Sequence, residues 1–168
     1  VSRLPLETCQ TMNGMWGYKV VDQEYKSTET LIRYLVSAAG KGANLLLNVG
    51  PQPNGELPAV AVERLKQMGE WMAMYGDTIY GTEAGDVKPQ EWGCTTRKGN
   101  RLFVHIFELD EEALYLPLTC KVTKAKNYIT GEGWGETIDE ADQQALSSLI
   151  SKLSVVVSSN FEMLEGES

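Results

Sequence analysis

Ala43-Asn44-Leu45-Leu46-Leu47-Asn48-Val49-Gly50-Pro51 is the stretch of sequence that decides the fold. It is a short, almost wholly apolar segment that ends in a turn, and a helical pattern lies on either side of it. A strand that is apolar on both faces is typical of a parallel sheet covered by helices. Polar residues at the carboxyl end of such a strand lie where these sheets bind ligands. The stretch therefore predicts part of an α/β enzyme.

The segments around this strand repeat one supersecondary unit. Residues 7–12 form a short strand, and a loop rich in glycine and aromatic residues follows it. Ser27 occupies the N-cap position of a helix that ends at Gly40. After the apolar strand, Pro58 begins a second helix that ends at Gly76. This order makes two consecutive β/α units, and we expect their strands to lie side by side and parallel.

The pattern changes after Gly81, where short β-rich segments begin. Two strands are expected at Glu91–Thr96 and Arg101–Glu108, joined by the hairpin signal Arg97-Lys98-Gly99-Asn100. Further strands are expected at 113–118, 121–130 and 155–157, and a helix at 139–153. We therefore expect two domains, an α/β domain over residues 1–85 and a mostly β domain over residues 86–168.

Composition excludes several classes of partner. The 168 residues carry a formal net charge of −8, which disfavours nucleic acid and anionic membranes. No apolar run approaches the roughly 18 residues that span a bilayer. Cys9, Cys94 and Cys120 form an odd set without CxxC spacing, so neither a disulfide framework nor a zinc site is indicated. We expect no metal and no cofactor.

Two β/α units do not make a complete sheet. Strands that are apolar on both faces and open at both edges need neighbouring strands. A closed (β/α)₈ barrel takes about 250 residues, far more than precede the β-rich part. We expect this chain to be the carboxyl-terminal part of a longer protein, and an open, self-contained α/β sheet is the alternative.

The chain also carries an ordered series of motifs. The series begins with Glu-Thr-Cys-Gln-Thr-Met-Asn-Gly-Met-Trp-Gly-Tyr at residues 7–18, Ser-Thr-Glu-Thr-Leu-Ile at 27–32 and Lys-Gly-Ala-Asn-Leu-Leu-Leu-Asn-Val-Gly-Pro at 41–51. It continues with Gly-Glu-Trp at 69–71, Gly-Asp-Thr-Ile-Tyr-Gly at 76–81 and Leu-Phe-Val-His-Ile-Phe at 102–107. Over roughly residues 7–118 the series resembles the family-29 glycoside hydrolases, the retaining α-L-fucosidases.

The resemblance implies a fold and an activity. The fold would be α/β followed by mostly β, namely the carboxyl-terminal part of a (β/α)₈-like barrel with an appended β-sandwich. The activity would be the release of terminal α-linked L-fucose with retention, by a nucleophilic carboxylate and an acid/base carboxyl. The family's nucleophile is an aspartate on a mid-barrel strand, and its acid/base lies ahead of Glu7. Both would lie outside this chain, which should be inactive alone.

The sequence departs from the family pattern in three places. Leu6 stands where the family usually has Trp, and Met15 stands where a small or polar residue is commoner. After Leu118 the match fades. These departures concern the details of the sandwich more than the fucosidase assignment.

Four residues are candidates for a functional site. The family places an aromatic residue like Trp16 against the sugar, although Trp16 could instead pack its loop onto the barrel rim. Asn48 could donate to a sugar hydroxyl or, as we favour, tie down a neighbouring loop. Glu7 is the only acid in the first motif, but its place at the start of a strand favours a structural role over catalysis. His105, the lone histidine, is expected to be structural.

The resemblance also implies partners and a compartment. The expected partners are a fucosylated oligosaccharide or glycoconjugate and the remainder of the barrel, with no nucleic acid and no membrane span. Family members that degrade glycans are commonly secreted, periplasmic or lysosomal. The alternatives are a non-catalytic carbohydrate-binding or interaction module in the β region, around Trp134, and a related barrel glycosidase that prefers another sugar such as galactose.

Overall fold

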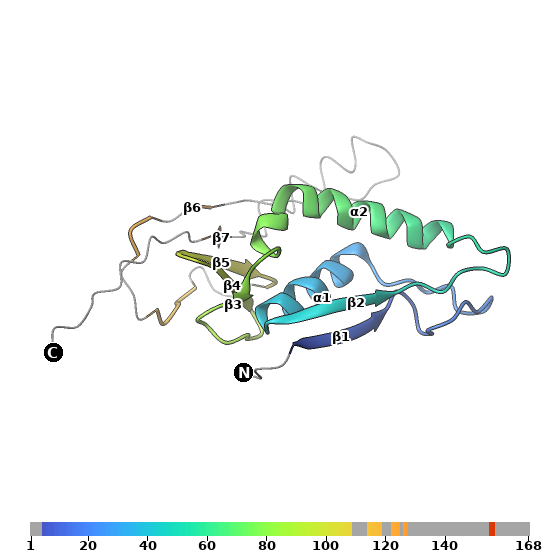
Figure 1. The fold of residues 1–168 in the computed structure, drawn as a ribbon, viewed down its shortest axis with the longest axis horizontal. Helices are drawn as coiled ribbons and strands as arrows, with labels where there is room; N and C mark the ends of the chain where they lie inside the picture. Colours follow the sequence, from blue (N-terminus) through green and yellow to red (C-terminus); the bar gives the residue numbers. More distant parts are fainter. Residues whose placement is uncertain (1–4, 109–113, 119–121, 125, 128–154, 157–168) are drawn as a thin grey trace. The chain divides into compact units, whose positions relative to one another are not determined.

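The computed structural model describes residues 5–108, 114–118, 122–124, 126–127 and 155–156, which Figure 1 draws as a coloured ribbon. The chain divides into two compact units, Val1–Thr82 (unit 1) and Glu83–Ser168 (unit 2). The helix expected at 139–153 and the residues Cys120 and Trp134 lie outside the described residues. Among the helices that are described, none is long and apolar enough to cross a membrane.

Unit 1 contains a two-stranded parallel sheet. Strand β1 (Leu6–Thr11) pairs with strand β2 (Ala43–Asn48), with Glu7 opposite Asn44 and Cys9 opposite Leu46. The predicted parallel pairing of the two β/α units is therefore confirmed. It follows from the right-handed crossover through the helix between the strands.

Helix α1 (Thr28–Gly40) connects β1 to β2 and has the boundaries that its capping residues predict. The Ser27 Oγ atom accepts a hydrogen bond from the Thr30 backbone N–H at 3.1 Å, which satisfies one of the free N–H groups of the first turn. The helix buries an apolar stripe that includes Leu31, Ile32 and Val36. Beyond Gly40, Gly42 has a φ of 69°, a left-handed conformation that lets the chain turn into β2.

Helix α2 (Ala59–Tyr75) follows β2, and the short 3₁₀ helix η1 (Gly76–Thr78) continues it. Pro58 is the N-cap residue, one position before the first turn where we expected it. Ala61 and Met68 are buried, whereas Leu65 on the same apolar stripe is 37% exposed. Among the described helices, α1 packs against α2, and the stripe that α2 buries is narrow.

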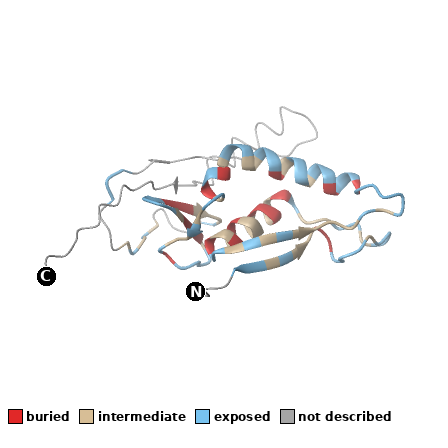
Figure 2. Cartoon of the chain, in the orientation of Figure 1, coloured by how far each residue is buried: buried red, intermediate tan, exposed pale blue. Residues whose placement is uncertain are grey.

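The sheet of unit 1 is covered on one face within the described residues. Leu45 and Leu47 are half-buried on the face that α1 covers. On the opposite face Glu7, Cys9 and Leu46 are exposed, and 41% of Leu46 is accessible. Figure 2 shows this contrast between the buried stripe of α1 and the paler strands. The expectation of cover on both faces is thus not met by the described residues alone.

Within its described residues, unit 2 contains two small antiparallel sheets. Strands β3 (Glu83–Ala84), β4 (Gly93–Lys98) and β5 (Arg101–Ile106) lie in that order in one sheet, and β6 (Lys126–Asn127) pairs with β7 (Val155–Val156) in the other. The β4–β5 hairpin is confirmed, because Lys98 pairs with Arg101 across a two-residue turn.

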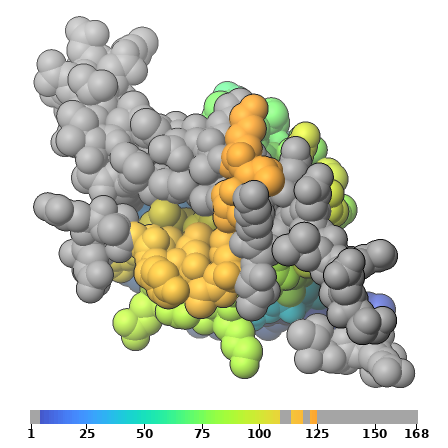
Figure 3. Space-filling model, turned by 90° about the vertical axis from the view of Figure 1, so that its left-hand side faces the viewer, coloured from blue at the N-terminus to red at the C-terminus, as the bar shows by residue number. Residues whose placement is uncertain are grey.

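One predicted strand of unit 2 is wrong, and another is shorter than expected. Of the strand expected at 121–130, the described residues show only β6 at 126–127, because residues 122–124 have no regular secondary structure. Residues 114–118 have no regular secondary structure. Pro117 lies within this segment, and proline has no backbone N–H to give to a strand ladder. Tyr115 is 87% exposed, and Figure 3 shows residues of this segment, in yellow-orange, on the surface. The segment is therefore an exposed connection.

Candidate functional site

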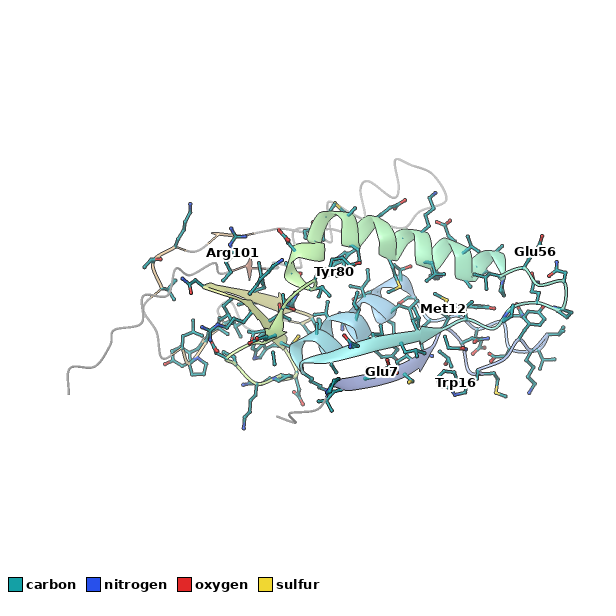
Figure 4. The ribbon with its side chains drawn as sticks, in the orientation of Figure 1. Glu7, Met12, Trp16, Glu56, Tyr80 and Arg101 are labelled. Atoms are coloured by element: carbon teal, nitrogen blue, oxygen red, sulfur yellow. The ribbon has the colours of Figure 1, made fainter. Side chains whose placement is uncertain are left out.

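An exposed aromatic loop follows the carboxyl end of β1. We call residues 13–26 the Trp16 loop. Its Trp16 side chain is 55% exposed, and Figure 4 shows this residue beyond the end of the strand. Met15, Val20 and Val21 of the same loop are exposed as well. A large exposed indole at the carboxyl end of a parallel strand is well placed to contact a ligand, because ligand sites of such sheets lie at this end.

Lys26 ties the two ends of the Trp16 loop together. Its Nζ atom donates to the backbone carbonyl oxygens of Thr11 at 2.6 Å and Asn13 at 3.0 Å. Its backbone N–H donates to the carbonyl oxygen of Met12 at 2.8 Å. Met12 and Asn13 are buried. The lysine thus provides hydrogen-bond donors to three carbonyl groups at the end of β1 and the start of the loop.

A second set of contacts crosses the middle of the loop. The Asn13 Nδ2 atom donates to the carbonyl oxygen of Asp22 at 3.2 Å. The Oδ2 atom of Asp22 is buried and has no hydrogen-bond donor among the described residues. Burial raises the pKa of Tyr25, and the nearby Tyr18 and Asp22 raise it further. These groups favour the neutral phenol, because burial and neighbouring negative charge both disfavour the phenolate.

Asn48 connects the Trp16 loop to the second strand. Its Nδ2 atom donates to the backbone carbonyl oxygen of Trp16 at 2.5 Å. Asn48 is the last residue of β2, so this hydrogen bond joins the carboxyl end of β2 to the loop that follows β1. The tie to a neighbouring loop, which the sequence favoured for this residue, is present. A contact between Asn48 and substrate stays a prediction.

Glu7 lies away from Trp16, near the amino end of β1. Its side chain is exposed on the open face of the sheet, with the Cys9 thiol 3.8 Å from its Oε1 atom. Figure 4 shows Glu7 on the strand itself and Trp16 beyond the strand's end. The position agrees with a structural role, and a catalytic role for Glu7 stays a prediction.

Another carboxylate, which the sequence analysis passed over, lies at the Trp16 end of unit 1. Figure 4 shows Glu56 at this end, in the connection between β2 and α2. Its Oε2 atom accepts a hydrogen bond from Asn54 Nδ2 at 2.9 Å, and its backbone N–H donates to Asn54 Oδ1 at 3.1 Å. The turn contains Asn54-Gly55, a pair of residues that is common in turns. Both contacts fold the connection on itself, so Glu56 acts here as a turn residue.

The other candidates lie outside this region of the chain. His105 is on β5, where its Nε2 atom and the Thr96 Oγ1 atom are 2.9 Å apart, in agreement with a structural role. Among the residues that the structure describes, no group of three or more histidine, cysteine, aspartate and glutamate side chains is arranged to hold a metal ion. The residues brought together are therefore Trp16 and Asn48, with Lys26 as an addition that local sequence pattern did not indicate.

Comparison with known proteins shows which family the chain resembles. The family model described as Alpha-L-fucosidase matches residues 1–77, which contain both β/α units. The plasma alpha-L-fucosidase of Rattus norvegicus is 35% identical over 109 residues, covering 60% of this chain and 24% of the rat protein. The chain thus spans about a quarter of the length of this curated relative.

Solved structures agree with the sequence relatives. Alpha-L-fucosidase isoenzyme 1 from Paenibacillus thiaminolyticus aligns with a TM-score of 0.67 and 30% identity, over 98% of this chain and 38% of that chain. A Thermotoga maritima alpha-fucosidase in complex with fucose aligns with a TM-score of 0.63 and 26% identity, over 93% of this chain and 40% of that chain. The family match, the sequence relatives and the structural likeness together show that the chain is similar to alpha-L-fucosidases in sequence and in structure.

Proposed function

We propose that the complete protein containing this chain is a retaining exo-glycoside hydrolase that releases terminal α-linked L-fucose from glycans. The position of Trp16 carries this proposal. The residue is exposed on a tethered loop at the carboxyl end of β1, within the segment that matches the family. Active sites of (β/α)₈ enzymes lie at this end of the strands.

The role proposed for Trp16 is to hold the sugar. An indole face is large, rigid and apolar, and one side of a fucose ring presents C–H groups and the methyl group on C5. Burying these groups against the indole removes apolar surface from water. A sugar with a hydroxymethyl group at C5 would bring a polar hydroxyl against the indole, which favours fucose over such a sugar as the substrate.

The carboxylates of the reaction are proposed to lie elsewhere in the complete protein. A retaining glycosidase needs a nucleophile and an acid/base roughly 5–5.5 Å apart. Glu7 lies near the amino end of β1, and Glu56 is hydrogen-bonded within its own turn. Neither carboxylate is therefore a good candidate for the nucleophile or the acid/base. We expect the 168 residues alone to hydrolyse no fucoside.

The proposed architecture explains the open face of unit 1. We assign β1–α1 and β2–α2 to the last two units of a (β/α)₈-like barrel, with a domain boundary after residue 85 and a β-sandwich over residues 86–168. The helices of such a barrel lie outside, so the face with Glu7, Cys9 and Leu46 would point into the barrel. The exposed apolar surface of Leu46 and the unpaired outer edges of β1 and β2, among the described strands, support this assignment.

The substrate is proposed to be a fucosylated oligosaccharide or glycoconjugate, met in a secreted, periplasmic or lysosomal setting. The name of the rat relative, a plasma enzyme, supports the extracellular choice.

The first experiment compares two chromogenic substrates with the purified complete protein. We expect release of 4-nitrophenol from the α-L-fucoside and little from the α-D-galactoside. Proton NMR of the first product formed should show the α-anomer, as retention requires. A preference for the galactoside, or initial formation of the β-anomer, would contradict the proposal.

Replacement of the indole tests the role of Trp16 in that enzyme. In Trp16→Ala we expect KM for the fucoside to rise about ten- to a hundredfold, since burying a large apolar side chain contributes about 1.5–3 kcal/mol. Tyr80→Ala is the matched control, because Tyr80 is also an exposed aromatic residue of unit 1, 67% accessible, but lies outside the Trp16 loop. An unchanged KM in Trp16→Ala, or an equal rise in both variants, would remove Trp16 from the site.

A further inference from the structure

The Trp16 loop lies directly against the glycine that follows β2. A Cβ atom built on Gly50 would stand 2.4 Å from the backbone nitrogen of Tyr18 and 2.7 Å from the carbonyl carbon of Gly17. Real side chains do not approach backbone atoms this closely, so any other residue at position 50 must displace the loop. Tyr18 and Gly17 are the two residues after Trp16, and the displacement would move the indole.

The need for glycine here is steric and not conformational. Gly50 is absent from the glycines with a positive φ, which include Gly42 and Gly55 in the same unit. Its backbone is therefore one that other residues adopt without strain. The space that Tyr18 and Gly17 occupy is what excludes a side chain.

Asn48 acts on the same loop from two residues earlier. Its Nδ2 atom donates to the carbonyl oxygen of Trp16, so the loop is held by a hydrogen bond beside the tight backbone contact at Gly50. The Asn48 amide holds the loop by a hydrogen bond, and the absence of a side chain at Gly50 lets the loop backbone approach closely. Together these two contacts determine the position of Trp16 relative to the carboxyl end of β2.

We propose that Gly50 and Asn48 are positioning residues for Trp16, which set the place of the indole in the sugar site from the second β/α unit. The inference rests on the proposed function, because it treats Trp16 as a sugar contact. Neither residue needs to touch the substrate to act in this way. The loop is thus a preformed wall of the site.

A double-mutant cycle in the complete enzyme tests this role. We expect Gly50→Ala to lower kcat/KM on the order of 10- to 100-fold, because misplacement by about 1 Å has an effect of this size. The loss should fall on KM more than on kcat, since the sugar contact is made before the reaction. In the Trp16→Ala background the same substitution should change kcat/KM by less than about twofold, because its effect acts through the indole.

Two further variants complete the cycle. Asn48→Ala introduces no clash and should lower kcat/KM about two- to tenfold, as expected for one hydrogen bond. If Gly50→Ala does not fold, the double-mutant cycle is performed with Asn48→Ala instead. Gly69→Ala is the matched control, because Gly69 lies in α2 and a Cβ there meets nothing within 4 Å. It should leave both kinetic constants unchanged. A loss in Gly50→Ala or Asn48→Ala that persists undiminished in the Trp16→Ala background would overturn the proposal.

Amide hydrogen exchange separates this inference from the proposed function. In Gly50→Ala the amides of residues 16–18 should exchange faster than in the parent protein, whether or not fucose is released. If the complete protein releases no fucose but the exchange rises, the proposed function is wrong and the positioning of Trp16 is upheld. If fucose is released and the exchange is unchanged, the positioning role is wrong and the proposed function stands.

Discussion

Strands β2 and β5 have the same length and a similar apolar composition, but they differ in burial. In β5 the consecutive residues Leu102, Phe103 and Val104 are 0%, 5% and 1% exposed, so both faces of the strand are covered. In β2, Leu46 is 41% exposed and its neighbours are half-buried. An apolar strand with one open face is unfavourable in water. The difference supports the proposal that further strands cover β2 in the complete protein, whereas β5 is already covered.

The largest expected effect is in the covered strand. Leu102→Ala should lower the free energy of unfolding by about 2–5 kcal/mol, because it leaves a cavity where a side chain is fully buried. Urea unfolding of the complete protein measures this change. Arg101→Ala, at the exposed neighbouring position, is the control and should change the stability by less than about 0.5 kcal/mol. Equal effects in the two variants would show that β5 is not a core strand.

The next effect tests whether β2 is covered in the complete protein. Leu46→Ala should cost about 2–4 kcal/mol there, since the proposed barrel buries this side chain. Met74→Ala, at a residue of α2 that is 68% exposed, should have an effect near zero. If Leu46→Ala in the complete protein is as mild as Met74→Ala, the open face of unit 1 remains in water and the barrel assignment fails.

The smallest effect concerns Tyr25, a half-buried residue of the Trp16 loop. Its pKa is raised above the ordinary value of 10.0, so its contribution to stability is fully present below that value and is lost as the pH rises through the higher folded pKa. The melting temperature of Tyr25→Phe should therefore fall less between about pH 9 and pH 11 than that of the parent protein. Tyr115→Phe, at an 87% exposed position, should follow the parent. Parallel curves for Tyr25→Phe and the parent would show that Tyr25 is not buried.

Local sequence signals predicted most elements of the described fold. Ser27 and Gly40 bounded α1 because a cap and a terminal glycine act on adjacent backbone groups. The Gly99-Asn100 turn fixed the β4–β5 hairpin for the same reason. The strand expected at 113–118 is not formed by residues 114–118. The apolar residues there suggested a strand, but Pro117 has no backbone N–H to donate to a ladder. Local chemistry therefore explains both the successes and this error.

The site was predictable only in part. The place of Trp16 followed from the order of strand and loop, and so did the tie made by Asn48. The contacts of Lys26 with Thr11 and Asn13 and the approach of Gly50 to Tyr18 join residues far apart in sequence. Periodicity and turn signals describe neighbours along the chain, so they carry no information about such contacts. The sequence therefore indicated the exposed residue that we propose as a ligand contact but missed part of what holds it.

A crystal structure of the complete protein with bound L-fucose tests the central claim most directly. We expect further parallel strands on both sides of the β1–β2 pair, and the apolar face of the sugar against the Trp16 indole. A structure in which β1 and β2 keep open edges, or in which fucose binds away from the Trp16 loop, would contradict the account.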